Sequence, residues 1–244
     1  WAGDVRSALD WPMTTPPQAI RVLVVDDDAL VREAYRSFFR KAADLDLVGE
    51  ARDGGEAIDA YATLRPDVVL MDLQMPRCSG VEATARICSK WSDACIVALT
   101  TFGTREYIVA ALRAGASGYL LKDTGAQNLL AGIKQALRGD MPMSSSVRRQ
   151  LVESVKSEVP LNQEPVDIGL TPRETELLGW LAQGLTNYQI GREMYVSEGS
   201  VKQYLAHVGD KMGLKSRTQI LVKAIQLRIV DPHALPRSSE VAAR

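Results

Sequence analysis

Short apolar runs alternate with amphipathic segments through the first half of the chain. Five such runs, rich in Val, Ile or Leu, follow one another at intervals of some 20 to 28 residues and end near Asp26, Ala51, Asp72, Thr100 and Lys122. The segments between them, such as 29–42 and 80–91, carry apolar residues at three- and four-residue spacing, which is typical of helices. Strands that alternate with helices in this way predict an α/β fold with a doubly wound parallel sheet.

The pattern changes after the fifth of these units. Met141-Pro142 ends the last helix, a stretch with helical spacing follows over 144–159, and two prolines then interrupt the chain. We therefore expect residues 20–139 to form one domain and residues 140–169 to connect it to the next.

Residues 170–232 are expected to form a compact second domain of four short helices. Thr171, Pro172 and Glu174 supply a capping hydroxyl, a proline at the first helical position and an acidic residue at the third, which together make a strong helix start. The later helices are expected at Asn187–Met194, Glu198–Met212 and Thr218–Ile229.

Composition limits the class of protein. Hydrophobic residues make up 46% and charged residues 24% of the 244 positions, which suits a soluble globular protein. No apolar run approaches the ~20 residues of a membrane span, so we expect no membrane partner. Residues 1–19 lack the apolar stretch of a signal peptide and are expected to be an extension, and residues 233–244 a tail. The three cysteines form no CxxC pair, which favours reduced thiols in a cytoplasm over a zinc site.

Charge is distributed unevenly between the two expected domains. The net charge of the chain is −1. Residues 20–139 hold 15 basic and 16 acidic side chains, whereas residues 170–230 hold 8 basic and 5 acidic side chains. A small basic module beside a neutral one indicates a nucleic-acid partner for the second domain.

Reactive side chains follow four of the expected strands. They are Asp26, Asp27, Asp28, Asp72, Thr100 and Lys122. Taken singly, each has a structural explanation as a helix cap, a turn former, a strand residue or a solvated charge. The carboxyl ends of parallel strands line one crevice, however, so successive strand ends favour a shared site. There the Lys122 ammonium would pair with one phosphoryl oxygen, and the Thr100 hydroxyl would donate a hydrogen bond to another.

The carboxylates of this group suggest a magnesium site. A carboxylate can attack phosphorus only where its repulsion with the phosphoryl oxygens is neutralised, and Mg²⁺ does this with hard oxygen ligands. We predict that Asp26, Asp27 and Asp72 hold Mg²⁺ and that the backbone carbonyl of Gln74 completes the protein ligands. Asp72 is the candidate nucleophile, which would form an acyl phosphate.

Residues 20–139 resemble the receiver domain of two-component response regulators. The resemblance rests on VVDD at the first strand, VVLMDLQMP at the third, ALT at the fourth and GYLLK at the fifth. It implies a flavodoxin-like five-stranded sheet, phosphoryl transfer from a sensor histidine kinase to Asp72, and Tyr119 as an aromatic switch residue. In such a switch the aromatic ring turns inward as the hydroxyl residue moves toward the phosphate. Asp123 stands where many receivers have proline, so a cis peptide is not assumed there.

The helix expected at Glu198–Met212 has two distinct faces. Its apolar face consists of Val201, Leu205, Val208 and Met212. The opposite face is polar, and a helix of this kind can enter a DNA major groove. Gln203 can pair with an adenine edge, Lys202 with guanine or phosphate, and Ser200 with a phosphate near the helix N-terminus. A small helical bundle with a solvated face is the alternative.

Residues 170–220 resemble the LuxR-type helix-turn-helix in a continuous match that begins with LTPRETELLGWLAQGLTNYQIGREM. By that resemblance Lys202, Gln203 and Ala206 face the bases, and Ala206 can contact a thymine methyl group. Gly209 stands where a large apolar residue is usual, and it should cost the helix about 1 kcal/mol relative to alanine.

A receiver followed by a LuxR-type module is the NarL/FixJ architecture. We therefore expect a cytoplasmic response regulator that controls transcription and that is no enzyme beyond its own phosphorylation and dephosphorylation. Phosphorylation of Asp72 should shift the packing between the domains and free the recognition helix. It should also favour a homodimer on double-stranded DNA, formed through the helix at Thr218–Ile229.

Two other functions remain open at this point. A haloacid-dehalogenase-like phosphatase also uses an Asp-x-Asp pair after its first strand, which Asp26 and Asp28 could mimic. It would need an acidic pair beyond Lys122, where Asp123 stands alone. The other alternative is a regulator that binds DNA without phosphorylation, and the intact acidic site argues against it.

Overall fold

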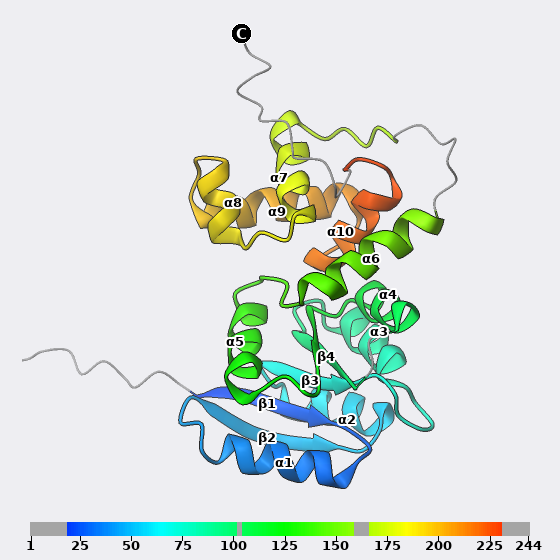
Figure 1. The fold of residues 1–244 in the computed structure, drawn as a ribbon, viewed down its shortest axis with the longest axis vertical. Coiled ribbons are helices and arrows are strands. Elements are labelled where there is room, and N and C mark those ends of the chain that lie inside the picture. The colour runs from blue at the N-terminus through cyan, green and yellow to red at the C-terminus, as the bar shows by residue number, and fades with distance from the viewer. Residues whose placement is uncertain (1–18, 102–103, 159–165, 231–244) are drawn as a thin grey trace, which may run out of the picture.

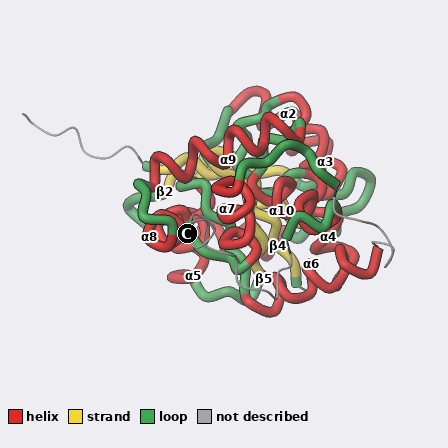
Figure 2. Tube along the Cα trace, turned by 90° about the horizontal axis from the view of Figure 1, so that it is seen from above, coloured by secondary structure: helices red, strands yellow, loops and turns green. Residues whose placement is uncertain are grey.

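The computed structural model describes residues 19–101, 104–158 and 166–230. A sheet unit and a helical unit are stacked along the long axis of the molecule, with helix α6 (Ser145–Glu158) lying between them (Figure 1). Viewed along that axis, the helices of the second unit overlie the sheet unit (Figure 2). The expected extension and tail lie almost entirely outside the described residues.

The sheet has five parallel strands in the order β2-β1-β3-β4-β5. The strands are β1 (Ile20–Val25), β2 (Leu45–Ala51), β3 (Val68–Asp72), β4 (Ile96–Thr100) and β5 (Gly118–Leu121). This is the flavodoxin-like order, and the prediction of a doubly wound α/β fold is confirmed. The strand ends expected from the sequence agree with these bounds to within one residue.

Helices cover both faces of the sheet. They are α1 (Ala29–Phe39), α2 (Gly54–Leu64), α3 (Gly80–Lys90), α4 (Arg105–Ala114) and α5 (Ala126–Leu137). Alternate residues of β1 face opposite sides, as a pleated strand requires. Val22 and Val24 pack with residues of α1 and α5, whereas Leu23 and Val25 pack with residues of α2 and α3. Because both faces are covered, the central strands β3 and β4 are buried at every position, whereas the edge strand β2 keeps polar residues.

The second unit consists of four helices, as expected. They are α7 (Pro172–Ala182), α8 (Asn187–Glu193), α9 (Glu198–Met212) and α10 (Arg217–Gln226). The capping box of Thr171 and Glu174 is present, which confirms the predicted helix start. The last helix is shorter than expected, because Arg228 adopts a left-handed backbone conformation with φ of 56° and the helix cannot continue through it.

Helix α6 packs against both units. It contacts α4 on one side and α10 on the other. Its apolar residues Val147, Leu151, Val152 and Val155 are buried in one continuous hydrophobic cluster that extends from α4 and β5 to α7–α10. The stretch expected to connect the domains is therefore a structural element of the interface. Within the described ranges, no helix has the length and apolar character that crossing a bilayer requires.

Candidate functional site

The acidic residues that follow β1 and β3 lie together at the carboxyl edge of the sheet. Val25 pairs with Met71 in the parallel ladder, so the next residues, Asp26 and Asp72, are neighbours. Carboxylate oxygens of Asp26, Asp27 and Asp72 all lie within 4.8 Å of one another. Asp26 and Asp72 are buried, whereas Asp27 is exposed. The structure thus brings the three predicted metal ligands into one group.

Lys122 reaches this group from the end of β5. Its Nζ lies 2.7 Å from Oδ2 of Asp26 and 2.8 Å from Oδ2 of Asp72. Burial raises the pKa of Asp26, and its contact with Lys122 opposes that shift. Burial would lower the pKa of Lys122, but the hydrogen bonds with Asp26 and Asp72 outweigh it and leave this pKa raised. A single ammonium thus contacts two of the three carboxylates.

The donor set of this group fits a hard divalent cation. Carboxylate oxygens are the ligands that Mg²⁺ prefers, and spacing within 4.8 Å allows them to share one ion. The raised pKa of Asp26 has the same implication, because a buried carboxylate without enough positive charge is costly. Asp28, by contrast, is exposed and accepts a hydrogen bond from the amide of Leu30 at 2.8 Å, so it caps α1.

Two further predicted residues lie beside the acidic group. The amide of Gln74 donates to Oδ1 of Asp72 at 3.3 Å, so its peptide is in the immediate vicinity of the candidate nucleophile. Thr100 ends β4 and is fully buried. Because β4 lies between β3 and β5, the Thr100 position falls between Asp72 and Lys122.

Tyr119 is also fully buried, in the cluster that joins the two units. Burial raises its pKa to about 12, and the nearby Thr100 side chain opposes that shift. In the described part of the chain no partner completes a hydrogen bond of standard geometry to its hydroxyl. Because the Tyr119 ring is already buried in this structure, a switch at this position would have to change the contacts that the ring makes within the core.

The predicted DNA-contacting residues lie on α9. Lys202, Gln203 and Ala206 are exposed on this helix, and Ser200 is partly exposed in its first turn. Lys202 forms an ion pair with Glu198 at 3.1 Å. The amide of Ser200 donates to the hydroxyl of Ser197, which caps the helix.

Gly209 has a clear packing role on the buried side of α9. A Cβ atom at this position would collide with the carbonyl oxygen of Leu214, whose amide donates to the Gly209 carbonyl at 2.8 Å. The close approach of the chain after the helix requires glycine. The expected loss of helix propensity is therefore offset by packing, and substitution by alanine is not the improvement that propensity alone predicts.

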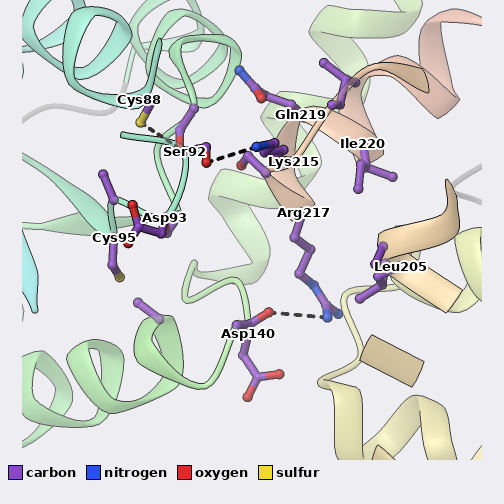
Figure 3. Close-up of a pocket in the computed structure, with 18 of the residues that line it drawn as sticks. Cys88, Ser92, Asp93, Cys95, Asp140, Leu205, Lys215, Arg217, Gln219 and Ile220 are labelled. Carbon is purple, nitrogen blue, oxygen red and sulfur yellow. Dashed lines mark hydrogen bonds between the residues drawn. The ribbon is translucent and has the colours of Figure 1, made fainter. Parts of the chain in front are cut away.

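A cavity of about 1160 Å³ separates α9 from the sheet unit (Figure 3). Lys202, Leu205, Ala206 and Asp210 of α9 line it from one side. Residues from α3, the α3–β4 loop and the end of α5 line the other side, among them Ser89, Ser92, Asp93 and Arg138. Two of the three predicted base-facing residues thus face the sheet unit.

Hydrogen bonds hold the two units together around this cavity. They run from Thr218 Oγ1 to Ala116 O at 2.7 Å, from Gln219 Nε2 to Arg113 O at 2.9 Å, from Asn187 N to Asp140 Oδ1 at 3.0 Å and from Lys215 Nζ to Ser92 Oγ at 3.1 Å. Figure 3 shows Arg217 extending toward the turn at Asp140. Burial lowers the pKa of Arg217 to about 10. These contacts were not predicted from the sequence, where the one available signal was Thr218, a polar residue that the structure buries on α10.

A hydrogen bond also ties the edge of the sheet to the chain that leads into α6. The amide of Tyr119 donates to the carbonyl of Pro142 at 2.8 Å. A Cβ atom on Gly118 would lie 2.8 Å from Cδ and 3.0 Å from the oxygen of Pro142. The approach at this point requires glycine, and it places the strand that carries Tyr119 directly against the start of the interdomain segment.

Comparisons with known proteins agree with this architecture. A family model described as the response regulator receiver domain matches residues 22–134, and one described as bacterial regulatory proteins, luxR family, matches residues 169–224. The transcriptional regulatory protein YxjL of Bacillus subtilis is 40% identical over 213 residues, which cover 87% of this chain and 98% of that protein. The nitrate/nitrite response regulator NarL of Escherichia coli is 36% identical over 208 residues, which cover 85% of this chain and 96% of that protein.

A solved structure matches part of this chain. The crystal structure of a LuxR-family two-component response regulator from an Aurantimonas species matches with a TM-score of 0.53 and 34% identity, over 56% of this chain and 98% of that one. The full-length relatives share both matched regions in the same order along nearly their whole length. The chain belongs to the family of two-component response regulators that join a receiver domain to a LuxR-type DNA-binding domain and regulate transcription.

Proposed function

We propose that this response regulator is switched when a sensor histidine kinase phosphorylates Asp72. The single observation that carries the proposal is the arrangement of Asp26, Asp27 and Asp72 within 4.8 Å of one another, with the ammonium of Lys122 on two of them. The acidic group opens at the strand ends, which is where ligands of α/β sheets bind. Gln74 would add its backbone carbonyl to the metal ligands.

The chemistry follows from these groups. Mg²⁺ bound to the carboxylates would neutralise the charge between the nucleophile and the phosphoryl oxygens. An oxygen of Asp72 attacks phosphorus, the bond from phosphorus to the kinase histidine nitrogen breaks, and that nitrogen keeps the electron pair. Lys122 then turns from the Asp72 carboxylate to a phosphoryl oxygen, and Thr100 donates a hydrogen bond to another. The phosphoryl group stays bonded to the Asp72 oxygen until water attacks the phosphorus, which releases inorganic phosphate and restores the carboxylate.

The readout we propose passes through β5 to the interface. A shift of Thr100 toward the phosphoryl group changes what Tyr119 packs against, because both side chains lie in one buried region. The backbone amide of Tyr119 donates a hydrogen bond to the carbonyl of Pro142, and α6 starts three residues later, at Ser145. Movement of this strand therefore acts directly on the segment that positions α6 between the domains.

The resting arrangement restricts the recognition helix. Lys202 and Ala206 line a cavity of about 1160 Å³ whose far wall belongs to the receiver, so the receiver lies in the path of a DNA duplex that approaches this side of α9. We propose that phosphorylation weakens the interdomain contacts and exposes this face of α9. Ser200, Lys202, Gln203 and Ala206 then meet double-stranded DNA, and Lys202 exchanges its ion pair with Glu198 for a phosphate or guanine.

The active form on DNA is proposed to be a homodimer formed through α10. In the resting arrangement α4 and α6 contact one part of this helix, and α7 and α9 contact it within its own unit. Release of the receiver would uncover the part of α10 that α4 contacts for a second copy of the chain. Symmetric DNA half-sites separated by about one helical turn are the expected target of such a dimer.

We propose that the protein acts in the cytoplasm and catalyses nothing beyond its own phosphorylation and dephosphorylation. The phosphatase alternative lacks support because Asp123 is exposed and, among the described residues, lies outside the acidic group. Binding to DNA independent of phosphorylation is disfavoured by the placement of Lys202 and Ala206 toward the receiver.

A labelling experiment tests the proposal. Wild-type protein is incubated with radiolabelled acetyl phosphate and Mg²⁺, and the incorporated label is measured beside two variants. Asp72→Asn should incorporate no label, whereas Asp59→Asn, which alters an exposed carboxylate on α2, should label like the wild type. Chelation of Mg²⁺ should stop labelling of the wild type. Equal labelling of Asp72→Asn would refute the assignment of the site.

A further inference from the structure

We infer that Arg32 on α1 is a positioning residue for the metal-binding carboxylates, an inference that rests on the proposed magnesium site. Arg32 holds the peptide unit that joins Asp26 to Asp27. Its Nη1 donates to the backbone carbonyl oxygen of Asp26 at 2.6 Å, and only 13% of its side chain is exposed. The role assigned to it is to fix the mutual orientation of the two consecutive carboxylates.

Two consecutive residues need such a device to bind one cation. In an extended strand, successive side chains point to opposite faces, so Asp26 and Asp27 would diverge if β1 continued through them. The strand ends at Val25, and Asp27 lies in a bend. The peptide between the two aspartates must therefore be held in a turned orientation, and the bond from Arg32 is made to the carbonyl of that peptide.

Other contacts fix Asp26 on its remaining sides. Its amide donates to the carbonyl of Ala51 at 3.1 Å, and its Oδ1 accepts from the amide of Asp28 at 3.0 Å. Within the described ranges, the carbonyl oxygen of Asp26 accepts no hydrogen bond from a neighbouring strand, and Arg32 supplies its donor. Loss of Arg32 would free this peptide to rotate and would move the Asp27 carboxylate away from its partners.

Glu50 on β2 offsets the positive charge that Arg32 places near the metal-binding carboxylates. An isolated guanidinium near the site would repel a metal cation and so weaken binding. Oε2 of Glu50 lies 3.6 Å from Nε of Arg32, which offsets that charge and leaves the directional hydrogen bond. Glu50 also receives two hydrogen bonds of 2.8 Å from Arg36, one turn further along α1. Arg36 shares this carboxylate with Arg32 but makes no contact with Asp26 among those recorded for the described residues, so it provides a matched control.

The experiment measures binding of Mn²⁺ alone to the full chain by electron paramagnetic resonance, without any phosphodonor. Loss of an outer partner that orients a metal ligand typically weakens metal affinity by about 10- to 100-fold. We expect that range for Arg32→Gln and a smaller loss for Arg32→Lys, which keeps the charge but not the planar fork. Arg36→Gln should stay within about twofold of the wild type. At saturating Mg²⁺, labelling of Arg32→Gln by acetyl phosphate should recover, because the nucleophile is unchanged.

The outcomes separate this inference from the proposed function. Wild-type Mn²⁺ affinity in Arg32→Gln, with an unchanged circular dichroism spectrum, would overturn the inference and leave the metal site intact. Equal losses in Arg32→Gln and Arg36→Gln would also overturn it, because the effect would then come from Glu50 or from α1 as a whole. Absence of Mn²⁺ binding in the wild type would overturn the metal site itself. If Arg32→Gln does not fold, the comparison of Arg32→Lys with Arg36→Gln decides the question.

Discussion

Substitution of Gly118 by alanine should open the resting protein without damaging either domain. The new Cβ atom would lie 2.8 Å from Cδ and 3.0 Å from the oxygen of Pro142, and every atom it approaches this closely belongs to that proline. Pro142 is not part of the sheet; it lies in the segment between α5 and α6. The simplest relief is displacement of this segment, which breaks the bond from the Tyr119 amide and shifts α6 from its place between the domains.

The size of the effect follows from the contact. Overpacking of a well-packed site costs about 1–3 kcal/mol. If that cost falls on the closed arrangement alone, the closed-to-open equilibrium changes by about 5- to 150-fold. Because a mostly closed protein binds in proportion to its open fraction, the DNA affinity of unphosphorylated Gly118→Ala should rise by the same factor. The phosphorylated variant and wild type should bind alike.

Fluorescence anisotropy is a suitable assay. The DNA is a labelled duplex obtained by in vitro selection with phosphorylated wild type, and binding is measured at fixed salt with and without phosphodonor. Gly125→Ala is the matched control, because a Cβ atom at Gly125 meets nothing within 4 Å. A Gly118→Ala protein that remains folded but binds no more tightly than wild type in the unphosphorylated state would refute the reasoning. It would mean that the contact with Pro142 does not hold the domains together.

Asp26, Thr218 and Gly209 each allow a further test. Burial raises the pKa of Asp26, so this carboxylate takes up a proton at a higher pH than an ordinary aspartate does. As the pH is lowered, Mg²⁺ affinity measured by calorimetry should therefore begin to fall at a higher pH than it would for a site of ordinary aspartates. For the same reason Asp26→Asn should raise the melting temperature of the metal-free protein at neutral pH and lose this advantage as the pH falls through that raised pKa. Thr218→Val leaves the buried carbonyl of Ala116 unsatisfied, at a cost of about 1–3 kcal/mol to the closed state, and should increase unphosphorylated DNA binding. Gly209→Ala should lower the free energy of unfolding, measured by urea denaturation, by about 1–3 kcal/mol. The collision of the new Cβ atom with the Leu214 carbonyl outweighs the higher helix propensity of alanine.

The receiver fold could be predicted because its signals are local. The strands β1, β3, β4 and β5 are dominated by apolar residues, and each of the first three helices starts after a capping Asp or Ser. The convergence of Asp26, Asp72 and Lys122 could be predicted from one rule, namely that the carboxyl ends of parallel strands lie at the same edge of the sheet. The structure agrees on the geometry, with the Lys122 ammonium within 2.8 Å of both carboxylates.

The polar contacts between the domains could not be predicted, because the residues that make them carry no periodic signal. Thr218 donates to the carbonyl of a residue 102 positions earlier, and the amide of Asn187 donates to Asp140 from 47 positions away. Each of these side chains is of a type usually found in water. Only the placement of one folded unit on another buries them.

Arg32 and Gly209 illustrate a second limit. A charged residue on an amphipathic helix suggests a solvated face, so nothing in its spacing indicates that Arg32 points back to a peptide six residues earlier. The glycine within α9 suggests a weak point, because propensity is counted along the helix and ignores the chain that crosses it at Leu214. In both cases the deciding contact is made to a backbone carbonyl, which a side-chain pattern does not report.

The continuous hydrophobic cluster through α4, α6 and α10 limits how the two domains can be recombined. A chimera that joins a foreign receiver to this DNA-binding unit at residue 140 would leave α6 without the α4 surface against which it packs. A graft that exchanges α4 and α6 together would keep that fit intact. Domain exchange among such regulators should therefore succeed according to the match across this helix, and poorly matched grafts should yield proteins that stay active without any signal.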